Sequence, residues 1–232
     1  MAGNLNVMAS VAFKGVLERF EPEFLQSTGF VFAPVYAPAG TVVKRVRAGT
    51  TADVVVVTPE TMKLLIDEGL AVAGSERNIA TSVVGVAVRA GAPKPKIATA
   101  DDVRAALIAA KSVAYTDPST GAASGVHFVQ LLERFGIADA VKAKARLGDG
   151  GPVAEFVARG EAEIAIQQLC EHMLVPGVDV VGPLPDELNK TTVFTAGVTK
   201  SAAAPGEGAA LIKLLLAPHV RSAMPSHGLT PV

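Results

Sequence analysis

Hydrophobic residues follow two alternating spacings along the first seventy residues of the chain. Short apolar runs at Leu5–Met8, Phe30–Tyr36 and Val54–Val57 have the length and β-branched content of buried strands. Between the first two runs, apolar residues recur at helical spacing from Phe13 to Phe24. Strands that alternate with helices in this way predict a parallel sheet with helices on its faces.

A second set of alternating elements begins after a connector rich in proline and lysine at residues 92–96. A strand is expected before it, at Thr81–Val88, and residues 201–208 are expected to form a loop near the end of the chain. The chain therefore contains two α/β sets. Further strands are expected at Val113–Tyr115, Ile164–Ile166, Val178–Val181 and Thr192–Thr195, and further helices at Asp101–Ala110, Ala122–Phe135, Ile137–Ala145, Val153–Arg159 and Ala209–Leu216.

Length, apolar runs and charge limit the kinds of partner that the protein is expected to bind. The 232 residues suit one large domain or two small lobes, and no apolar run reaches the length of about 20 residues that crosses a bilayer. Lysine plus arginine number 21 and aspartate plus glutamate 22, without blocks of like charge. We therefore expect no nucleic-acid partner and no membrane insertion. A small anionic ligand remains compatible with this charge, because backbone amides can hold an anion.

The N-terminal sequence and the cysteine content bear on the cellular compartment. Cys170 is the single cysteine, so no intrachain disulfide can form. The first residues have neither the basic segment nor the apolar segment of a signal peptide. As given, the chain is expected to be cytoplasmic; it is expected to be periplasmic if the sequence is that of a mature form. A transporter partner is expected only if the protein is exported.

Small residues build four junctions between a loop and a helix. Ligands of open α/β sheets bind beyond the carboxyl ends of the strands, where the starts of helices present free N–H groups. Plain helix capping is the alternative for any single junction, since helix starts favour Ser, Thr and Gly. The residues expected to bind an anion through amides or hydroxyls are Ser10, Val11, Ala12, Ala39, Gly40, Thr41, Ser119, Thr120, Ser124 and Gly151.

Candidate catalytic groups are few. His127, one turn after Ser124, is our candidate general base, because histidine is the residue type whose unperturbed pKa lies near neutrality; a solvent-exposed or capping histidine is the alternative. Cys170 and His172 form a short pair that lacks an obvious orienting group. Asp53 is expected to make local turn hydrogen bonds. No metal-ligand spacing occurs, and neither a metal nor a cofactor is expected.

The order and spacing of four segments resemble the molybdate-binding proteins, which belong to the type II periplasmic binding proteins. The resemblance spans nearly the whole chain and implies an α/β, two-lobed, type II periplasmic-binding-protein-like fold with two hinge crossings. The segments are Leu5–Ser10, Ala48–Val54, Asp117–Gly125 and Gly160–Ile166. The implied lobes are 1–82 plus 196–232 and 83–195, with hinge strands near 81–88 and 192–195.

The same resemblance implies a function. The chain is expected to bind a small oxyanion or carboxylate and to close its two lobes on this ligand by hinge motion. The tyrosine of the family's last ligand loop falls near Gln168, which joins the expected ligand residues. The serines of its first two loops fall at about Ala12 and near Ala39–Gly40 in this chain. The set of groups expected to contact the ligand therefore differs from the family's and suits a carboxylate equally well.

An alternative function comes from two further segments. Pro185–Leu188 and Thr195–Val198 resemble the organic-anion and aconitate-isomerase-like branch of these proteins. That resemblance implies a cofactor-independent isomerase that moves an allylic proton on a small polycarboxylate, so whether the chain is an enzyme stays open. A ligand-sensing effector domain is the least favoured alternative, because no helix-turn-helix is expected ahead of Leu5.

Overall fold

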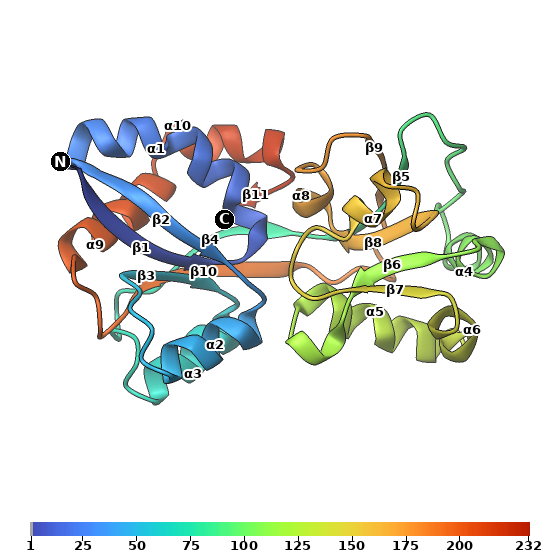
Figure 1. The fold of residues 1–232 in the computed structure, drawn as a ribbon, viewed down its shortest axis with the longest axis horizontal. Coiled ribbons are helices and arrows are strands. Elements are labelled where there is room, and N and C mark those ends of the chain that lie inside the picture. Colours follow the sequence, from blue (N-terminus) through green and yellow to red (C-terminus); the bar gives the residue numbers. More distant parts are fainter. Residues whose placement is uncertain (1) are drawn as a thin grey trace. The chain divides into compact units, whose positions relative to one another are not determined.

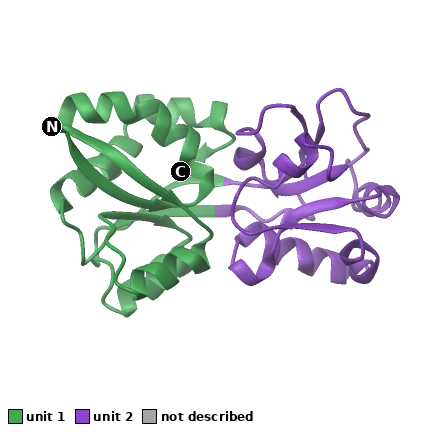
Figure 2. Cartoon of the chain, in the orientation of Figure 1, with its two compact units in different colours: residues 1–81, 193–232 green, residues 82–192 purple. Residues whose placement is uncertain are grey.

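A computed structural model describes residues 2–232 and divides the chain into two compact units (Figures 1 and 2). Unit 1 contains the residues through Thr81 together with Val193–Val232, and unit 2 contains Ser82–Thr192. The chain therefore passes between the units twice. Across residues 2–232, no helix combines the length and the apolar character that a membrane crossing requires.

Unit 1 is built on a six-stranded sheet with the order β11-β4-β10-β3-β1-β2. At its centre β1 pairs in parallel with β2 and β3, whereas β10 pairs antiparallel with β3. Figure 1 shows α1 and α10 on one face of this sheet and α2 and α3 on the other. The strands are β1 (Gly3–Ala9), β2 (Phe30–Tyr36), β3 (Val54–Val57), β4 (Arg77–Ser82), β10 (Thr192–Val198) and β11 (Thr230–Pro231), and the helices are η1 (Val11–Phe13), α1 (Lys14–Thr28), α2 (Ala39–Arg47), α3 (Pro59–Asp67), α9 (Pro205–Leu215), α10 (Pro218–Ala223) and η3 (Met224–His227).

Unit 2 is built on a five-stranded sheet with the order β7-β6-β8-β5-β9. Here β6 pairs in parallel with β7 and β8, and β5 pairs antiparallel with β8 and β9. The strands are β5 (Val84–Arg89), β6 (Val113–Thr116), β7 (Ala145–Gly148), β8 (Ile164–Gln168) and β9 (Val178–Pro183), and the helices are α4 (Ala100–Ala109), η2 (Pro118–Thr120), α5 (Ala123–Arg134), α6 (Ala138–Lys142), α7 (Ala154–Ala158) and α8 (Leu169–His172).

Alternation along β8 decides which way its last side chains face. Ile164 and Ile166 pack in the core beneath α5, whereas Ala165 packs in the smaller core beneath α7. Successive side chains of a strand point to opposite faces of the sheet. Gln167 therefore continues the α7 face, and Gln168 continues the α5 face.

Three expectations about individual elements are wrong. The strand expected at Thr81–Val88 is two strands: β4 ends at Ser82 in one sheet, and β5 begins at Val84 in the other. Alternation of apolar residues continues through both strands and cannot show where a chain leaves a sheet. The helix expected at residues 137–145 is shorter, because Ala145 begins β7, and α9 begins at Pro205 inside the expected loop.

Both sheets are mixed, not purely parallel. Their antiparallel members return from distant parts of the chain: β10 joins the sheet of unit 1, and β5 lies beside β8 in unit 2. Local periodicity identifies a strand but does not reveal its neighbour.

Asp53 anchors the start of β3 and is fully buried. One carboxylate oxygen, Oδ2, accepts hydrogen bonds from the backbone and side-chain nitrogens of Asn6 at 2.7 and 3.2 Å, and Oδ1 accepts from the amide of Ala204 at 2.8 Å. The expectation of local turn bonding is wrong, since the partners lie 47 and 151 residues away. Asp53 holds the amino end of β3 in place.

Candidate functional site

The loops that follow β1 and β2 meet at the carboxyl edge of the sheet in unit 1. The amide of Ala37 donates to the carbonyl of Ala9 at 3.0 Å, and the amide of Ser10 donates to the carbonyl of Val56 at 3.1 Å. Parallel pairing of the three strands places all three loops at this one edge. The structure thus brings the predicted residues of the first two junctions together.

Ser10 acts as a helix cap in this structure. Its hydroxyl accepts a hydrogen bond from the amide of Ala12 at 3.3 Å, at the start of η1. The side chains of Val11 and Ala12 are buried in the core. Among the side chains of these three residues, the Ser10 hydroxyl is the one that can still donate a proton to a ligand.

The first turn of α2 presents amides without a side-chain cap. Its N-cap is Pro38, whose carbonyl accepts hydrogen bonds from the amides of Thr41 and Val42 at 2.9 and 3.0 Å. The amides of Ala39 and Gly40 precede these bonds, and both residues are half-buried. These two N–H groups are oriented as donors at the positive end of the helix.

In unit 2, the loop after β6 is an organised turn around Asp117. The amide of Asp117 donates to the carbonyl of Gly148 at 2.8 Å, which joins the ends of β6 and β7. Its carboxylate accepts from the amide of Ser119 at 2.8 Å, and this bond lowers the pKa of Asp117. The Thr120 hydroxyl donates to the carbonyl of Asp117 at 2.7 Å. Ser119 and Thr120 therefore build the turn.

The start of α5 also lacks a side-chain cap. Its N-cap, Ala122, offers no side-chain acceptor, and the first helical hydrogen bond runs from the amide of Val126 to the carbonyl of Ala122. The amides of Ala123, Ser124 and Gly125 precede that bond. Ser124 is 4% exposed, and its hydroxyl has no hydrogen-bond partner among residues 2–232. A nearly buried free hydroxyl thus accompanies three helix-start amides.

Gln167 ties the loops of unit 2 to one another. Its side-chain nitrogen donates to the Thr116 hydroxyl at 3.1 Å and to the carbonyl of Gly151 at 3.2 Å, and its oxygen accepts from the amide of Val153 at 2.7 Å. Gly125 packs so closely on the other side of Thr116 that a Cβ there would lie 2.3 Å from the Thr116 carbonyl oxygen. We did not identify Gln167 from the sequence, although a glutamine that ends a buried apolar strand is itself a signal.

Gln168 has an unused polar atom at the end of β8. The residue is 3% exposed, and its side-chain nitrogen donates to the Thr192 hydroxyl at 2.8 Å. The side-chain oxygen has no partner among the described residues. A hydroxyl both donates and accepts, so the amide can satisfy Thr192 in either orientation and leave its NH₂ group free for an anion.

Three buried titratable residues lie together in α8. Burial raises the pKa of Glu171 to about 8, against a smaller opposing effect of a hydrogen bond with Gln167. Burial also lowers the pKa of His172 to about 4 and raises that of Cys170 far above its usual range. The Nε2 atom of His172 lies 3.2 Å from the carbonyl oxygen of Gly85. Cys170 and His172 are therefore both neutral near pH 7, so they do not form a thiolate pair.

His127 has a partner that limits its chemistry. Its Nε2 atom lies 2.7 Å from the carbonyl oxygen of Leu188, so this nitrogen carries the proton and donates it. Only Nδ1 is left to act as a base. The role of His127 in proton transfer stays a prediction.

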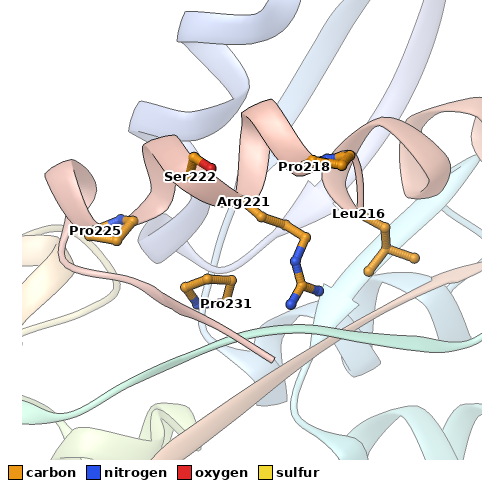
Figure 3. Close-up of a pocket in the computed structure, with 6 residues that line it drawn as sticks. All are labelled: Leu216, Pro218, Arg221, Ser222, Pro225 and Pro231. Atoms are coloured by element: carbon orange, nitrogen blue, oxygen red, sulfur yellow. The ribbon is translucent and has the colours of Figure 1, made fainter.

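Two surface cavities lie elsewhere in unit 1. One of about 520 Å³ is lined by residues near the C-terminus, including Leu216, with Arg221 pointing toward β11 (Figure 3). A second, of about 310 Å³, also contacts Leu216. None of the residues predicted to bind the anion lines either cavity. Within residues 2–232, no cluster of His, Cys, Asp and Glu side chains could hold a metal ion.

Comparisons with known proteins cover nearly the whole chain. A sequence profile described as "Bacterial extracellular solute-binding protein" matches residues 5–230. The aconitate isomerase of Pseudomonas sp is 32% identical over 234 residues, which cover 98% of this chain and 88% of that protein.

Similar solved structures include two proteins whose names state an oxyanion ligand. The periplasmic molybdate-binding protein of Azotobacter vinelandii has a TM-score of 0.81 and 21% identity, covering 97% of this chain and 98% of that one. The sulfate-binding protein SubI of Mycobacterium tuberculosis has a TM-score of 0.78 and 18% identity, covering 99% of this chain and 87% of that one. At these identities the likeness concerns the fold alone.

Proposed function

Because the chain belongs to the bacterial extracellular solute-binding protein family, we propose that it binds a small anion, an oxyanion or a carboxylate. The fold expected from the sequence, a two-lobed α/β fold of the periplasmic-binding-protein kind, is confirmed by the solved relatives. The observation that carries the proposal is the uncapped first turn of α5, where Ser124 is 4% exposed and its hydroxyl has no partner within residues 2–232.

The donors at the carboxyl edges suit an anion. In unit 2 the hydroxyl of Ser124 and the amides around it lie at the positive end of a twelve-residue helix. In unit 1 the amides of Ala39 and Gly40 have the same character. Lys44 and Arg45, which follow them on α2, are exposed, so the donors do not depend on buried cations. Neutral donors of this kind bind anions in a chain with a net charge of −1.

The donor groups predicted to contact the ligand suit a carboxylate as well as a tetrahedral oxyanion. The relatives of known structure are named for molybdate and sulfate. In this chain, the positions where the resemblance expects serine ligands fall at Ala12, which is buried, and near Ala39–Gly40. With fewer hydroxyls in unit 1, the amide of Gln168 and the free hydroxyl of Ser124 would supply the side-chain contacts.

The test is a thermal-shift and calorimetry screen. The panel contains molybdate, tungstate, sulfate, citrate, cis-aconitate and trans-aconitate, with neutral sugars as the control. A ligand that binds only the folded protein raises its stability by RT ln(1 + [L]/Kd), so at least one anion should raise the Tm in a concentration-dependent way. Stabilisation by sugars and by no anion would contradict the proposal. Small-angle scattering with and without the best ligand tests the expected closure of the two units.

A second candidate function is a cofactor-independent isomerase of a small polycarboxylate. One observation favours it: the aconitate isomerase of Pseudomonas sp matches 98% of this chain at 32% identity. Such a reaction moves one proton between carbon atoms and needs a base, an acid and donors for the developing negative charge. Proton NMR of trans-aconitate incubated with the protein in heavy water tests it directly. If the protein neither forms cis-aconitate nor incorporates deuterium, this activity is excluded for that substrate.

Location and transport partner follow from the choice between these functions. A protein that delivers its ligand to a membrane transporter has to be exported, whereas an isomerase can act in the cytoplasm. We propose the periplasm if the protein delivers its ligand to a transporter and the cytoplasm if it acts as an isomerase. Fractionation of the native host, with an antibody against this chain, distinguishes the two.

A further inference from the structure

The side chain of Gln167 lies between Glu171 and two loops of unit 2 that contain predicted ligand residues. Glu171 belongs to α8, which follows β8 directly, and the side chain of Gln167 lies close enough to lower the pKa of its carboxyl group. Gln167 in turn contacts the hydroxyl of Thr116 at 3.1 Å and the carbonyl of Gly151 at 3.2 Å. Thr116 precedes the loop to α5, and Gly151 lies in the loop to α7. The carboxyl of Glu171 is therefore at the carboxyl edge of the sheet in unit 2.

The surroundings of Glu171 give its carboxyl group no ionic partner. The residue is 8% exposed, and within residues 2–232 it forms no ion pair with a lysine or an arginine. Its neighbours on α8, Cys170 and His172, are buried as well. Burying an unpaired carboxyl group is unfavourable, and a glutamine could make the same contact with Gln167 without this cost. A requirement for packing alone does not explain a glutamate here.

We propose that Glu171 transfers the proton in the allylic isomerisation of a small polycarboxylate bound at the loops of unit 2. The proposal rests on the second candidate function above. It assigns the acid–base role to a residue other than His127, whose Nε2 proton is already donated to Leu188.

One carboxyl group can both remove and return the proton in this reaction. The Glu171 carboxylate removes a proton from the methylene carbon beside a substrate carboxylate, so that a C–H bond breaks and an O–H bond forms. The electron pair spreads over the allylic system. The new carboxylic acid then returns a proton to the far carbon of that system, the double bond shifts, and the carboxylate is regenerated. The step needs no oxidant, reductant or cofactor.

Two features of the site support this role. Burial raises the pKa of Glu171 to about 8, so the group gains and loses a proton near physiological pH, as an efficient general acid–base does. The uncapped amides of α5 and the Ser124 hydroxyl provide donors for the negative charge of the intermediate. Contacts link the two parts, because Gln167 and Gly125 both pack on Thr116.

The experiment follows deuterium uptake and isomerisation of trans-aconitate in heavy water by proton NMR. It compares the wild type with Glu171→Gln, which keeps the shape and the contact with Gln167, and with Glu60→Gln, an exposed control on α3. Glu171→Gln should lower the exchange rate at least 100-fold, while the Kd for trans-aconitate stays within about threefold of the wild-type value, and the control should change neither.

Other outcomes separate the inference from the function it rests on. Exchange that survives Glu171→Gln overturns the role of Glu171 and leaves the isomerase standing. No exchange by the wild type, with trans-aconitate still bound, overturns both and leaves the anion-binding protein. If Glu171→Gln does not fold, Glu171→Asp and the pH profile decide. The wild-type kcat/KM should rise as pH increases toward about 8, where the carboxylate forms. A rate that falls over that range, or full activity in Glu171→Asp, overturns the assignment.

Discussion

The side-chain amide of Gln167 donates a hydrogen bond of 3.1 Å to the hydroxyl of Thr116, which lies 51 residues earlier in the chain. Both residues are buried, and they stand near the carboxyl ends of the neighbouring parallel strands β8 and β6. The side-chain nitrogen of Gln167 also donates to the carbonyl of Gly151, and its oxygen accepts a hydrogen bond from the amide of Val153. One side chain therefore fixes the two loops of unit 2 that carry predicted ligand residues.

Gln167→Ala should destabilise the protein by at least about 2 kcal/mol, because it leaves several buried groups unpaired at about 1–3 kcal/mol each. Urea denaturation measures this loss. Gln130→Ala, at an exposed position of α5, is the matched control and should change the stability by less than about 0.5 kcal/mol. Equal values for the two variants would show that the Gln167 bonds contribute nothing.

Ser124→Ala should weaken the binding of the anion that the screen identifies. Loss of one hydrogen bond to a charged group costs about 1.5–3 kcal/mol, so the Kd should rise roughly 10- to 150-fold. Ser201→Ala, an exposed change far along the chain, should leave the Kd unaltered. Isothermal titration calorimetry measures both. If neither variant changes the Kd, the free hydroxyl of Ser124 has no role in binding.

Two glycines of unit 2 should respond differently to substitution. At Gly125 a Cβ would lie 2.3 Å from the backbone oxygen of Thr116, so Gly125→Ala has to displace the first turn of α5. It should lower the Tm and weaken binding together. At Gly151 a Cβ meets nothing within 4 Å, so Gly151→Ala should leave the Tm nearly unchanged. A lower affinity in Gly151→Ala, with an unchanged Tm, would then indicate close approach of the ligand to this loop.

Glu171 and His172 should shape the dependence of stability on pH. Folding raises the pKa of Glu171 from 4.5 to about 8, so the folded state binds the extra proton and loses stability as pH rises through this window. Folding lowers the pKa of His172 from 6.5 to about 4, so stability is lost as pH falls through that window. The two effects oppose each other between pH 4.5 and 6.5, and only the Glu171 effect acts between 6.5 and 8.

The measurement is urea denaturation of the wild type and Glu171→Gln from pH 5 to 8.5, in steps of about 0.5 pH unit. Between pH 6.5 and 8 the wild type should lose about 1.4 kcal/mol per pH unit, whereas Glu171→Gln should show no such loss. Parallel curves for the two proteins would mean that Glu171 does not titrate near neutrality in the folded state.

Much of the fold could be predicted from local pattern. The four valines of β3 and the helical spacing before Phe24 identify their elements because burial imposes a period on the sequence. The predicted junctions at Ala39 and Ser124 coincide with the starts of α2 and α5, because loops between strand and helix need small residues there. The resemblance to a known family additionally predicted the two-lobed fold, which the solved relatives confirm.

The contents of the candidate site depended on tertiary structure. Sequence spacing could not show that Gln167 reaches Thr116 and Gly151, since hydrogen bonds between loops follow from strand order, not from chain order. Nor could it show that Asp53 joins Asn6 to Ala204. Glu171 is the plainest case. Its residue type suggests an ordinary surface carboxylate, and only the packing of α8 buries it, which removes water and raises its pKa toward neutrality.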